Sequence, residues 1–301
     1  MKNYMKKFWG SLAILLATIL WGGAFSAQSK STEFVDPWLF IALRSLTAAV
    51  TLPLVVIFLD LLKLRRLTLW GNAQTEQQQK QLLTGGVLCG IILAAASLLQ
   101  QYGIQYTSVG KTGFLTALYI IIVPIIGTFF KHKVSFLMWI AVGLGMFGAY
   151  LLCGGISNIN LGEWMVIVGA LFYSLHILVI DKYAAICDCV RLSTIQFAVA
   201  AFFSLLLSAL LSTTWQWHNI YQSLPFWIFC GAFSGAAAFT LQMVAQKYLH
   251  PVTVTLLMSL ESVFAVLGGW IFLREWLTPR EIAGCTVIFV SVILAQLPKN
   301  E

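Results

Sequence analysis

We predict an all-α integral membrane protein, in which ten transmembrane helices form two inverted five-helix repeats. Hydrophobic residues make up 59 % of the 301-residue chain, charged residues only 10 %, and the mean hydropathy is +0.87. The polar residues in such a composition are too few to cover the surface of a soluble globular protein of that length. Apolar runs of about 20 residues recur along the chain. The runs of the second half of the chain correspond, in the same order, to the runs of the first half.

The apolar runs predict the membrane helices. Each has about the 20 residues that a helix needs to cross roughly 30 Å of hydrocarbon. The strands of a β-barrel would be about 10 residues long with alternating polarity, so a barrel is excluded. The first run is longer than the core of a signal peptide, so we expect a retained helix. The runs lie near residues 9–28, 38–62, 82–102, 109–130, 135–153, 162–182, 193–212, 225–246, 251–272 and 279–297.

The net charge of +7 is spread over short gaps between the runs, which indicates membrane topology and argues against a nucleic-acid partner. If the N-terminus is cytoplasmic, only four basic residues fall outside the cell, and Arg44 lies within a run. This bias predicts a multi-pass protein of the cell (inner) membrane with both termini in the cytoplasm. The basic residues expected inside are Lys2, Lys6, Lys7, Lys63, Arg65, Arg66, Lys80, Lys131, Lys133, Lys182, Arg191, Lys247 and Lys299; those outside are Lys30, Lys111, Arg274 and Arg280.

The chain lacks the usual signatures of catalysis and of metal binding. The six cysteines are scattered, so we expect free thiols, no metal site and no cofactor. His176 has no second histidine one turn away, which favours a hydrogen-bonded packing residue over a ligand. No H-E-x-x-H, no G-x-S-x-G and no pair of intramembrane aspartates occurs, so we predict that the protein is not an enzyme.

The two halves of the chain map onto each other. An offset of 142 residues pairs Tyr119 with Glu261, and an offset of 152 pairs Trp21 with Tyr173. Five spans match five spans, and because five is odd the second half enters the membrane from the opposite face. Inverted repeats are typical of alternating-access carriers, with a binding site near the midplane between the halves. The predicted repeats are residues 9–153 and 161–297, within one membrane domain.

Short motifs along the chain point to a known family. They are W-G-G-A-F at 21–25, F-I-A-L-R at 40–44, G-I-Q-Y-T-S-V-G-K-T-G-F-L at 103–115, L-Y-I-I-I-V-P at 118–124, and S-L-E-S-V-F-A…L-R-E-W-L-T at 259–278. In order and spacing they resemble the drug/metabolite transporter superfamily, and within it the EamA-type ten-helix carriers. Ser262 departs from that pattern, since these carriers often have proline after the glutamate. The resemblance implies carriage of amino acids or related compounds, with export as the expected direction.

Glu261 lies about ten residues into the ninth run, near the predicted midplane. A carboxylate at that depth is costly unless it is paired, protonated or facing water, which makes it a candidate for substrate binding or proton uptake. The alternative is a carboxylate that only ties two helices together. Arg44 is a candidate for holding a carboxylate or phosphate with its planar guanidinium. Alternatively, it could extend to the interface or pair with Glu261 or Glu33.

Five uncharged residues complete the predicted substrate site: Gln100, Gln242, Trp21, Tyr119 and Tyr173. The two glutamines occupy equivalent positions of the third and eighth spans, where an amide either binds substrate or joins two helices. The three aromatic residues lie in mid-span rather than in the interfacial belt, which favours a cavity lining over an interfacial role. Packing within the core is the alternative for them.

Small residues on the fifth run, Ala141, Gly145, Gly148 and Ala149, predict close approach of another helix, from the same chain or from a second copy. Pro53 and Pro124 are candidate sites for helix bends.

We therefore predict a secondary membrane transporter that moves small polar metabolites by alternating access. The alternatives are a carrier of drugs or toxic compounds, a nucleotide-sugar or organic-anion facilitator, and a multi-spanning membrane enzyme. The expected partners are a small-molecule substrate and the lipid bilayer, with protons as a candidate coupling ion and no nucleic acid. A monomer and a homodimer both fit the sequence.

Overall fold

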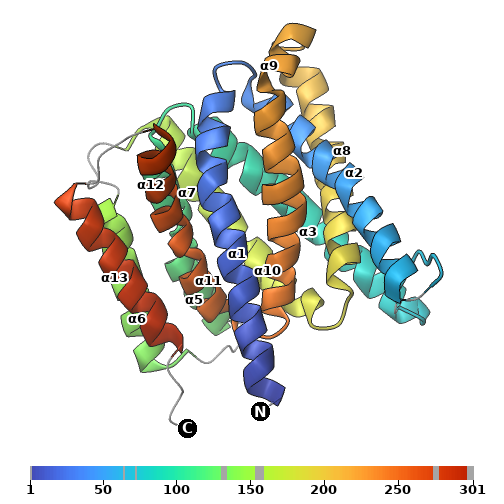
Figure 1. The fold of residues 1–301 in the computed structure, drawn as a ribbon, viewed down its shortest axis with the longest axis horizontal. Helices are drawn as coiled ribbons and strands as arrows, with labels where there is room; N and C mark the ends of the chain where they lie inside the picture. The colour runs from blue at the N-terminus through green and yellow to red at the C-terminus, as the bar shows by residue number, and fades with distance from the viewer. Residues whose placement is uncertain are drawn as a thin grey trace.

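The computed structural model describes residues 2–63, 65–71, 73–129, 134–152, 159–273 and 278–296. Within these ranges the chain is helical, without a strand, and its helices lie side by side in one bundle (Figure 1). Seven helical stretches are long and apolar enough by themselves to cross a membrane, and shorter apolar helices complete the bundle. The predicted all-α, multi-pass membrane fold is confirmed.

Each repeat contributes five spans, and three of the ten, the fourth, the eighth and the ninth, consist of more than one helical segment. The first repeat contains α1 (Lys2–Ser31), α2 (Pro37–Lys63), α3 (Glu76–Gly103), α4 (Val109–Thr116) with α5 (Tyr119–Phe129), and α6 (Phe136–Leu152). The second contains α7 (Leu161–Ala184), α8 (Cys189–Leu211), α9 (Trp217–Ile228) with the π-helix η1 (Phe229–Ala238) and α10 (Phe239–Gln246), α11 (Pro251–Met258) with α12 (Leu260–Leu273), and α13 (Pro279–Gln296).

The interrupted fourth and ninth spans correspond to each other. The 142-residue offset relates Ser108 to His250, and each of these side chains caps the helix that follows it, α4 or α11. The interruptions lie between Thr116 and Tyr119 and at Ser259, where the chain makes turns closed by hydrogen bonds to the residue three positions back. They do not lie at the prolines, since Pro53 and Pro124 are inside continuous helices.

Several helices begin earlier than the apolar runs predicted, and α3 and α9 are examples. α3 begins at Glu76 rather than near residue 82, because Thr75 and Gln78 form a reciprocal capping box. α9 begins at Trp217 rather than near residue 225. Hydropathy detects only the part of a helix that is apolar enough for hydrocarbon, so polar turns beyond that part were missed.

The packing of the helices follows a two-fold pattern. α2 packs against α8, and α6 packs against α13, so that each pair joins equivalent helices. α1 packs against α12 and against the span formed by α9, η1 and α10. Its equivalent α7 packs in the same way against α4, α5 and α3. Two inverted five-helix repeats therefore build the bundle.

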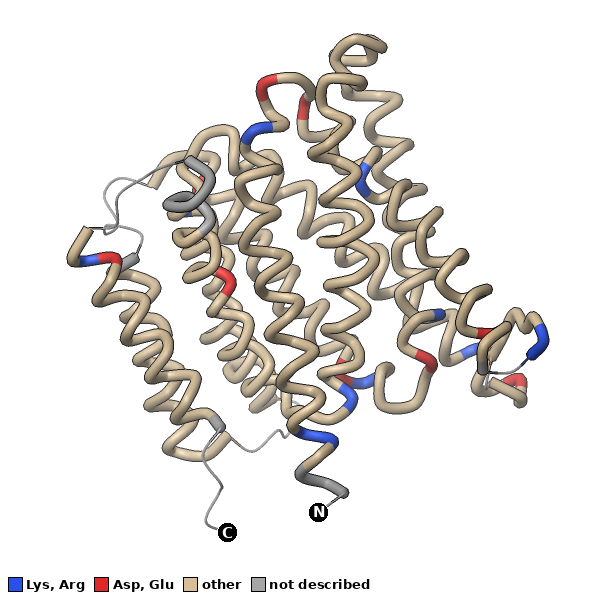
Figure 2. Tube along the Cα trace, in the orientation of Figure 1, with Lys and Arg blue, Asp and Glu red and all other residues tan. Residues whose placement is uncertain are grey.

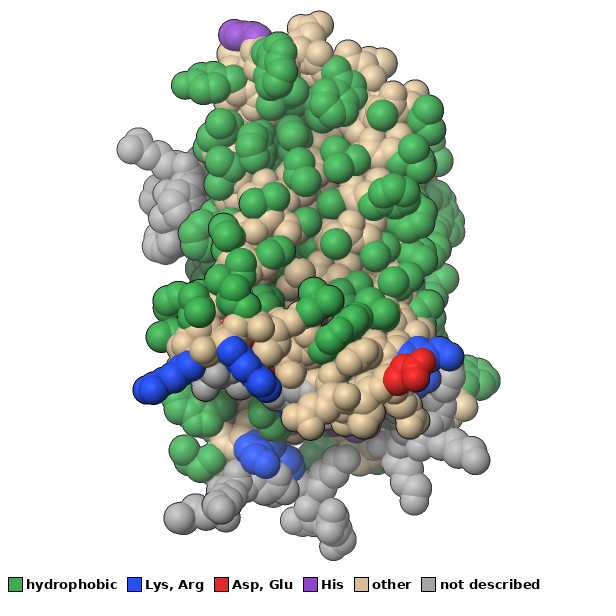
Figure 3. All heavy atoms as spheres, turned by 90° about the vertical axis from the view of Figure 1, so that its right-hand side faces the viewer, with side chains coloured by type: hydrophobic (Ala, Val, Ile, Leu, Met, Phe, Trp, Pro, Cys, Tyr) green, Lys and Arg blue, Asp and Glu red, His purple; other side chains and the backbone are tan. Residues whose placement is uncertain are grey.

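α1 begins and α13 ends at the same end of the bundle, which we call the terminal end; the opposite end is the far end (Figure 1). Basic residues gather toward the terminal end (Figure 2). The face shown in Figure 3 is covered by hydrophobic side chains over most of its height, with charged side chains near its lower edge. Lys131, Lys133, Arg274 and Lys299 lie outside the described residues.

Polar contacts tie α2 to the second repeat at both ends. At the terminal end, Arg191 of α8 donates to both carboxylate oxygens of Asp60 at 2.7 Å. At the far end, Asp36 accepts hydrogen bonds from the hydroxyls of Ser212 at 2.6 Å and Thr214 at 2.9 Å. Desolvation by itself would raise the pKa of Asp36, but these bonds and those from backbone N–H groups hold the pKa below its ordinary value.

Small residues join α6 to α13 within one chain, which settles one alternative left open by the sequence. A β-carbon added at Gly148 would meet the carbonyl oxygen of Gly284 at 2.8 Å and the backbone nitrogen of Ile288 at 2.9 Å. Five of the six cysteines are free thiols in the described part of the chain. The sixth, Cys153, lies outside it, as does the predicted end of the first repeat.

Replacing Gly148 by alanine should destabilise the protein, because the added methyl group meets backbone atoms that cannot rotate away. We expect the free energy of unfolding to fall by about 1–3 kcal/mol. Gly143, on the same helix, has no atom within 4 Å of an added β-carbon, so Gly143→Ala should leave stability unchanged or raise it. Thermal unfolding of both variants in detergent provides the comparison, and equal melting temperatures would contradict the packing.

Candidate functional site

One cavity lies between the two repeats and is lined by side chains from both of them. All seven residues of the predicted substrate site line this single cavity, although they come from seven different helices: Trp21, Arg44, Gln100, Tyr119, Tyr173, Gln242 and Glu261.

Glu261 and Tyr119 reach the cavity from the two helix interruptions. Tyr119 is the first residue of α5, and Glu261 is the second residue of α12. Both side chains line the cavity, where the phenol can donate a hydrogen bond and the carboxylate can accept one. Glu261 is only partly buried because it faces the cavity, whereas Tyr119 is buried. Tyr119 and Glu261, which occupy equivalent positions of the two repeats, therefore place a phenol and a carboxyl group on the same cavity.

Arg44 turns into the bundle and does not extend to the interface. Its guanidinium donates to Gln28 Oε1 at 3.2 Å and to Ser234 Oγ at 3.4 Å, and only 5 % of the residue is exposed. Glu33 instead pairs with Lys30 at 2.7 Å. Among the described residues Arg44 has no ion-pair partner, so the structure does not show the alternative in which it pairs with Glu261 or Glu33.

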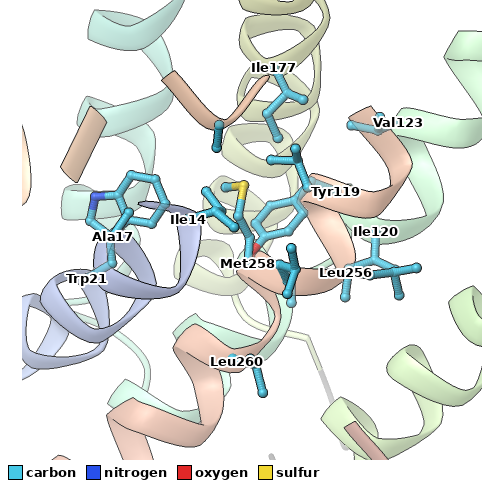
Figure 4. Close-up of a cluster of buried hydrophobic side chains, with 14 of the residues drawn as sticks. Ile14, Ala17, Trp21, Tyr119, Ile120, Val123, Ile177, Leu256, Met258 and Leu260 are labelled. Carbon is cyan, nitrogen blue, oxygen red and sulfur yellow. The ribbon is translucent and has the colours of Figure 1, made fainter. Parts of the chain in front are cut away.

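Ser234 of η1 also positions Trp21. The Trp21 indole N–H donates to the Ser234 carbonyl oxygen at 3.1 Å, and its ring packs at 66° against Phe239, with 5.1 Å between centroids. Figure 4 shows Trp21, Tyr119 and Met258 pointing into the same space from three helices. The π-helix thus fixes both the basic group and an aromatic wall of the cavity.

Gln100 is held by two neighbours on the wall of the first repeat. Its amide nitrogen donates to Thr116 Oγ1 at 2.9 Å, and its amide oxygen accepts from the Tyr173 hydroxyl at 3.2 Å. Tyr173 also lies 3.4 Å from Ser97 Oγ. These bonds fix the orientation of the Gln100 amide and of the Tyr173 ring.

Gln242 is the equivalent of Gln100, but its surroundings differ. Its amide nitrogen lies 3.9 Å from the Met258 sulfur, and its amide oxygen has no partner among the described residues. His176 also lines the cavity, as a fully buried residue whose Nε2 is 2.7 Å from Gln196 Oε1. The prediction of a hydrogen-bonded histidine is confirmed, but its place on the cavity was missed.

Six other lining residues were missed in addition to His176: Gln28, Thr116, Ile177, Ser234, Phe239 and Met258. Helical spacing could have found several of them. Gln28 follows Trp21 by seven residues, and Phe239 precedes Gln242 by three, so each pair shares a helix face. The repeat offset gives a further signal, because it relates Thr116 to Met258. Ser234 had no such signal, since η1 departs from α-helical spacing.

At the far end an ion pair joins the two repeats beside the cavity-forming helices. Lys111 of α4 donates to Glu163 of α7 at 3.0 Å, and Thr107 donates to the same carboxylate oxygen at 3.2 Å. The offsets relate Lys111 to Thr253 and Glu163 to Ser11, neither of which is ionisable. The terminal end therefore has no equivalent ion pair at these positions.

The cavity combines a guanidinium, a carboxyl group and three amides on aromatic and apolar walls. It presents its two opposite charges without pairing them to each other, because no Arg44–Glu261 ion pair occurs among the described residues. The same part of the chain contains no group of three or more His, Cys, Asp and Glu side chains that could hold a metal ion. Non-covalent recognition of a small polar molecule fits these groups.

Comparison with known proteins identifies relatives along nearly the whole chain. Residues 8–154 and 160–297 each match the EamA-like transporter family. An "Uncharacterized transporter" of Archaeoglobus fulgidus is 26 % identical over 301 residues, which cover 97 % of this chain and 87 % of that protein. The "Uncharacterized transporter YoaV" of Bacillus subtilis is 23 % identical, covering 94 % and 95 % of the two chains.

A solved structure described only as "Crystal structure of protein" has the same fold. It superposes with a TM-score of 0.76 at 15 % sequence identity and covers 95 % of both chains.

The Gln100–Thr116 bond should contribute measurably to stability. Thr116→Val keeps the shape of the side chain but leaves the Gln100 amide nitrogen without its acceptor, so we expect a loss of about 1–3 kcal/mol in the free energy of unfolding. Met258→Leu, at the equivalent position, removes only a weak sulfur acceptor and should cost less than about 1.5 kcal/mol. Thermal unfolding in detergent tests both; a larger effect at Met258 would contradict this assignment.

Proposed function

Because the chain belongs to the EamA-like transporter family, we propose that it is a secondary transporter of small zwitterionic metabolites, amino acids or related compounds, which it exports by alternating access. One observation carries this proposal: a guanidinium and a carboxylate face one cavity and are not paired with each other. A zwitterion with an ammonium and a carboxylate group complements that arrangement. A purely anionic or purely cationic substrate would leave one of the two charges without a partner.

Each charged group has a defined role in this proposal. Arg44 holds the substrate carboxylate, because its planar guanidinium can donate two parallel hydrogen bonds. Glu261 accepts hydrogen bonds from the substrate ammonium, with the Tyr119 hydroxyl orienting the carboxylate. Gln100, Gln242, Trp21 and Tyr173 form the remaining walls, which contact the uncharged part of the substrate.

Inverted repeats supply the transport cycle. In a carrier built from inverted repeats, the two access states are related by exchanging the roles of the repeats. The excess of basic residues at the terminal end supports a cytoplasmic location for that end, in the inner membrane. Under this orientation, the Lys111–Glu163 ion pair lies on the outer side and favours closure there.

Glu261 also provides a route to proton coupling. A carboxylate that alternates between accepting an ammonium group and accepting a proton can exchange one for the other, which would drive export with proton entry. The alternative within the same proposal is facilitated diffusion, in which Glu261 stays ionised throughout.

Uptake by proteoliposomes tests the function as a whole. The panel contains amino acids, amines without a carboxylate and organic acids without an amine, each measured with and without a pH gradient. We expect saturable counterflow of amino acids only. Flux that does not saturate would indicate a channel, and transport restricted to organic acids would replace the proposal with an anion carrier.

Neutralising Glu261 should impair binding of the substrate ammonium. Losing a charge-assisted hydrogen bond costs about 1.5–3 kcal/mol, which is roughly a 10- to 100-fold loss of affinity for Glu261→Gln. Any dependence of transport on a pH gradient should disappear as well. Glu76→Gln, on the exposed first turn of α3, is the matched control. Unaltered transport and pH dependence in a folded Glu261→Gln protein would refute both roles.

The role of Arg44 depends on its shape as well as its charge. Arg44→Lys keeps the charge but loses the bidentate geometry, so we expect at least about a tenfold rise in the half-saturating concentration of amino acids. Arg66→Lys, at an exposed position, is the control and should have no effect. Counterflow kinetics measure both variants. Wild-type values for Arg44→Lys would exclude bidentate binding.

A further inference from the structure

The two equivalent glutamines of the cavity differ in how their hydrogen-bonding groups are satisfied. Gln100 uses its amide nitrogen on Thr116 and its amide oxygen on Tyr173. Gln242 has only a sulfur atom 3.9 Å from its nitrogen, and its buried Oε1 has no partner among the described residues. Both residues are at least 95 % buried, so bulk water does not compensate for this difference.

The repeat offsets identify why Gln242 lacks partners. Thr116, the acceptor for Gln100, is replaced by Met258, whose thioether is a weak acceptor. Tyr173, the donor to Gln100, is replaced by Trp21, which has no hydroxyl and directs its only N–H to Ser234. Two differences between the repeats thus remove the hydrogen-bonding partners of the Gln242 amide, whereas the amide of Gln100 keeps both of its partners.

His176 adds a second free acceptor to the same wall. Its Nε2 contacts an amide oxygen, Gln196 Oε1, so in the neutral ring Nε2 carries the hydrogen and Nδ1 is an acceptor. Nδ1 is buried and has no partner among the described residues. The imidazole packs edge-on against Phe239, with 5.8 Å between ring centroids, and Gln242 lies one turn further along the same helix. His176, Phe239 and Gln242 all line the cavity.

We propose that His176 Nδ1 and Gln242 Oε1 form a subsite that accepts hydrogen bonds from a hydroxyl or carboxamide group on the side chain of the substrate. This subsite rests on the proposed function for the head group of the substrate, which Arg44 and Glu261 bind. Both atoms are uncharged acceptors, so they select a neutral donor. Phe239, which packs against His176 and precedes Gln242 by three residues, contacts the carbon atoms that carry that donor.

The physical basis of selection is the cost of leaving buried acceptors unpaired. A substrate with a donor satisfies them, whereas an apolar substrate of the same shape displaces water without replacing its hydrogen bonds. A site built around a hydrogen bond therefore rejects the analogue that lacks the donor more strongly than an apolar pocket rejects an added hydroxyl. The carrier should prefer threonine to valine and asparagine to leucine, by about tenfold for each pair.

Counterflow in proteoliposomes with these two pairs tests the subsite. For each protein we compare the ratio of the two rates within a pair, which does not depend on the amount of folded carrier. We expect Gln242→Met and His176→Phe to bring the ratio from about tenfold to within about twofold, by slowing only the donor-bearing member. Gln246→Met is the matched control, because Gln246 lies one turn away on α10, is buried and does not line the cavity. Its ratio should stay at the wild-type value.

The outcomes separate this inference from the proposed function. Equal rates for threonine and valine in the wild type, or an unchanged ratio in both variants, would overturn the subsite while leaving an amino-acid carrier in place. Absence of any amino-acid counterflow would overturn the proposed function. The subsite is then tested on the purified protein by thermal stabilisation with 3-hydroxybutyrate and butyrate. Stronger stabilisation by 3-hydroxybutyrate, lost in Gln242→Met, supports it, and equal stabilisation overturns it.

Discussion

The hydrocarbon core of a bilayer offers no water to hydrogen-bond a peptide group, so a spanning helix can be interrupted only where other protein groups or a polar cavity surround it. The fourth and ninth spans are interrupted in this way between Thr116 and Tyr119 and at Ser259. Both interruptions must therefore lie inside the bundle, and the side chains that follow them face its centre. The position of Glu261 on the cavity is a consequence of that constraint. A carboxylate on an uninterrupted, lipid-facing helix would be far more costly.

The helices are arranged with two-fold pseudosymmetry, but the side chains that line the cavity are not. The backbone contacts of the repeats correspond closely, down to the capping residues Ser108 and His250. The side chains on the cavity do not correspond: the equivalent of Glu261 is Tyr119, and the equivalent of Arg44 is Gln196. The pseudosymmetry allows the two repeats to exchange roles at the two ends of the cavity. The unlike side chains give the cavity a direction, so under the proposed function a zwitterion would bind in one orientation.

The sequence predicted the spans, their order and half of the cavity residues because hydrophobic length and the repeat offset report on position along the membrane normal. Glu261 and Arg44 were recognisable because charges are rare at that depth. The interruptions were not predicted, since residues 117–118 and Ser259 are neither glycine nor proline. A bend was expected at Pro124 instead, which lies inside the continuous helix α5. The neighbours that orient Arg44, which are Gln28 and Ser234, depend on helix packing and on a π-helix. Neither the spacing of apolar residues nor the offset encodes that packing.

The separation of Arg44 from Glu261 has an energetic consequence for the transport that we propose. Removing one partner of a buried ion pair leaves an uncompensated charge and typically costs about 3–5 kcal/mol. An empty cavity closed at both ends would hold two such charges, whereas a bound zwitterion would compensate both. Closure is then more favourable when the carrier is loaded than when it is empty. A carrier of this kind exchanges substrate across the membrane faster than it returns empty, unless a proton neutralises Glu261. The two unpaired charges thus connect recognition of a zwitterion with control of the transport cycle.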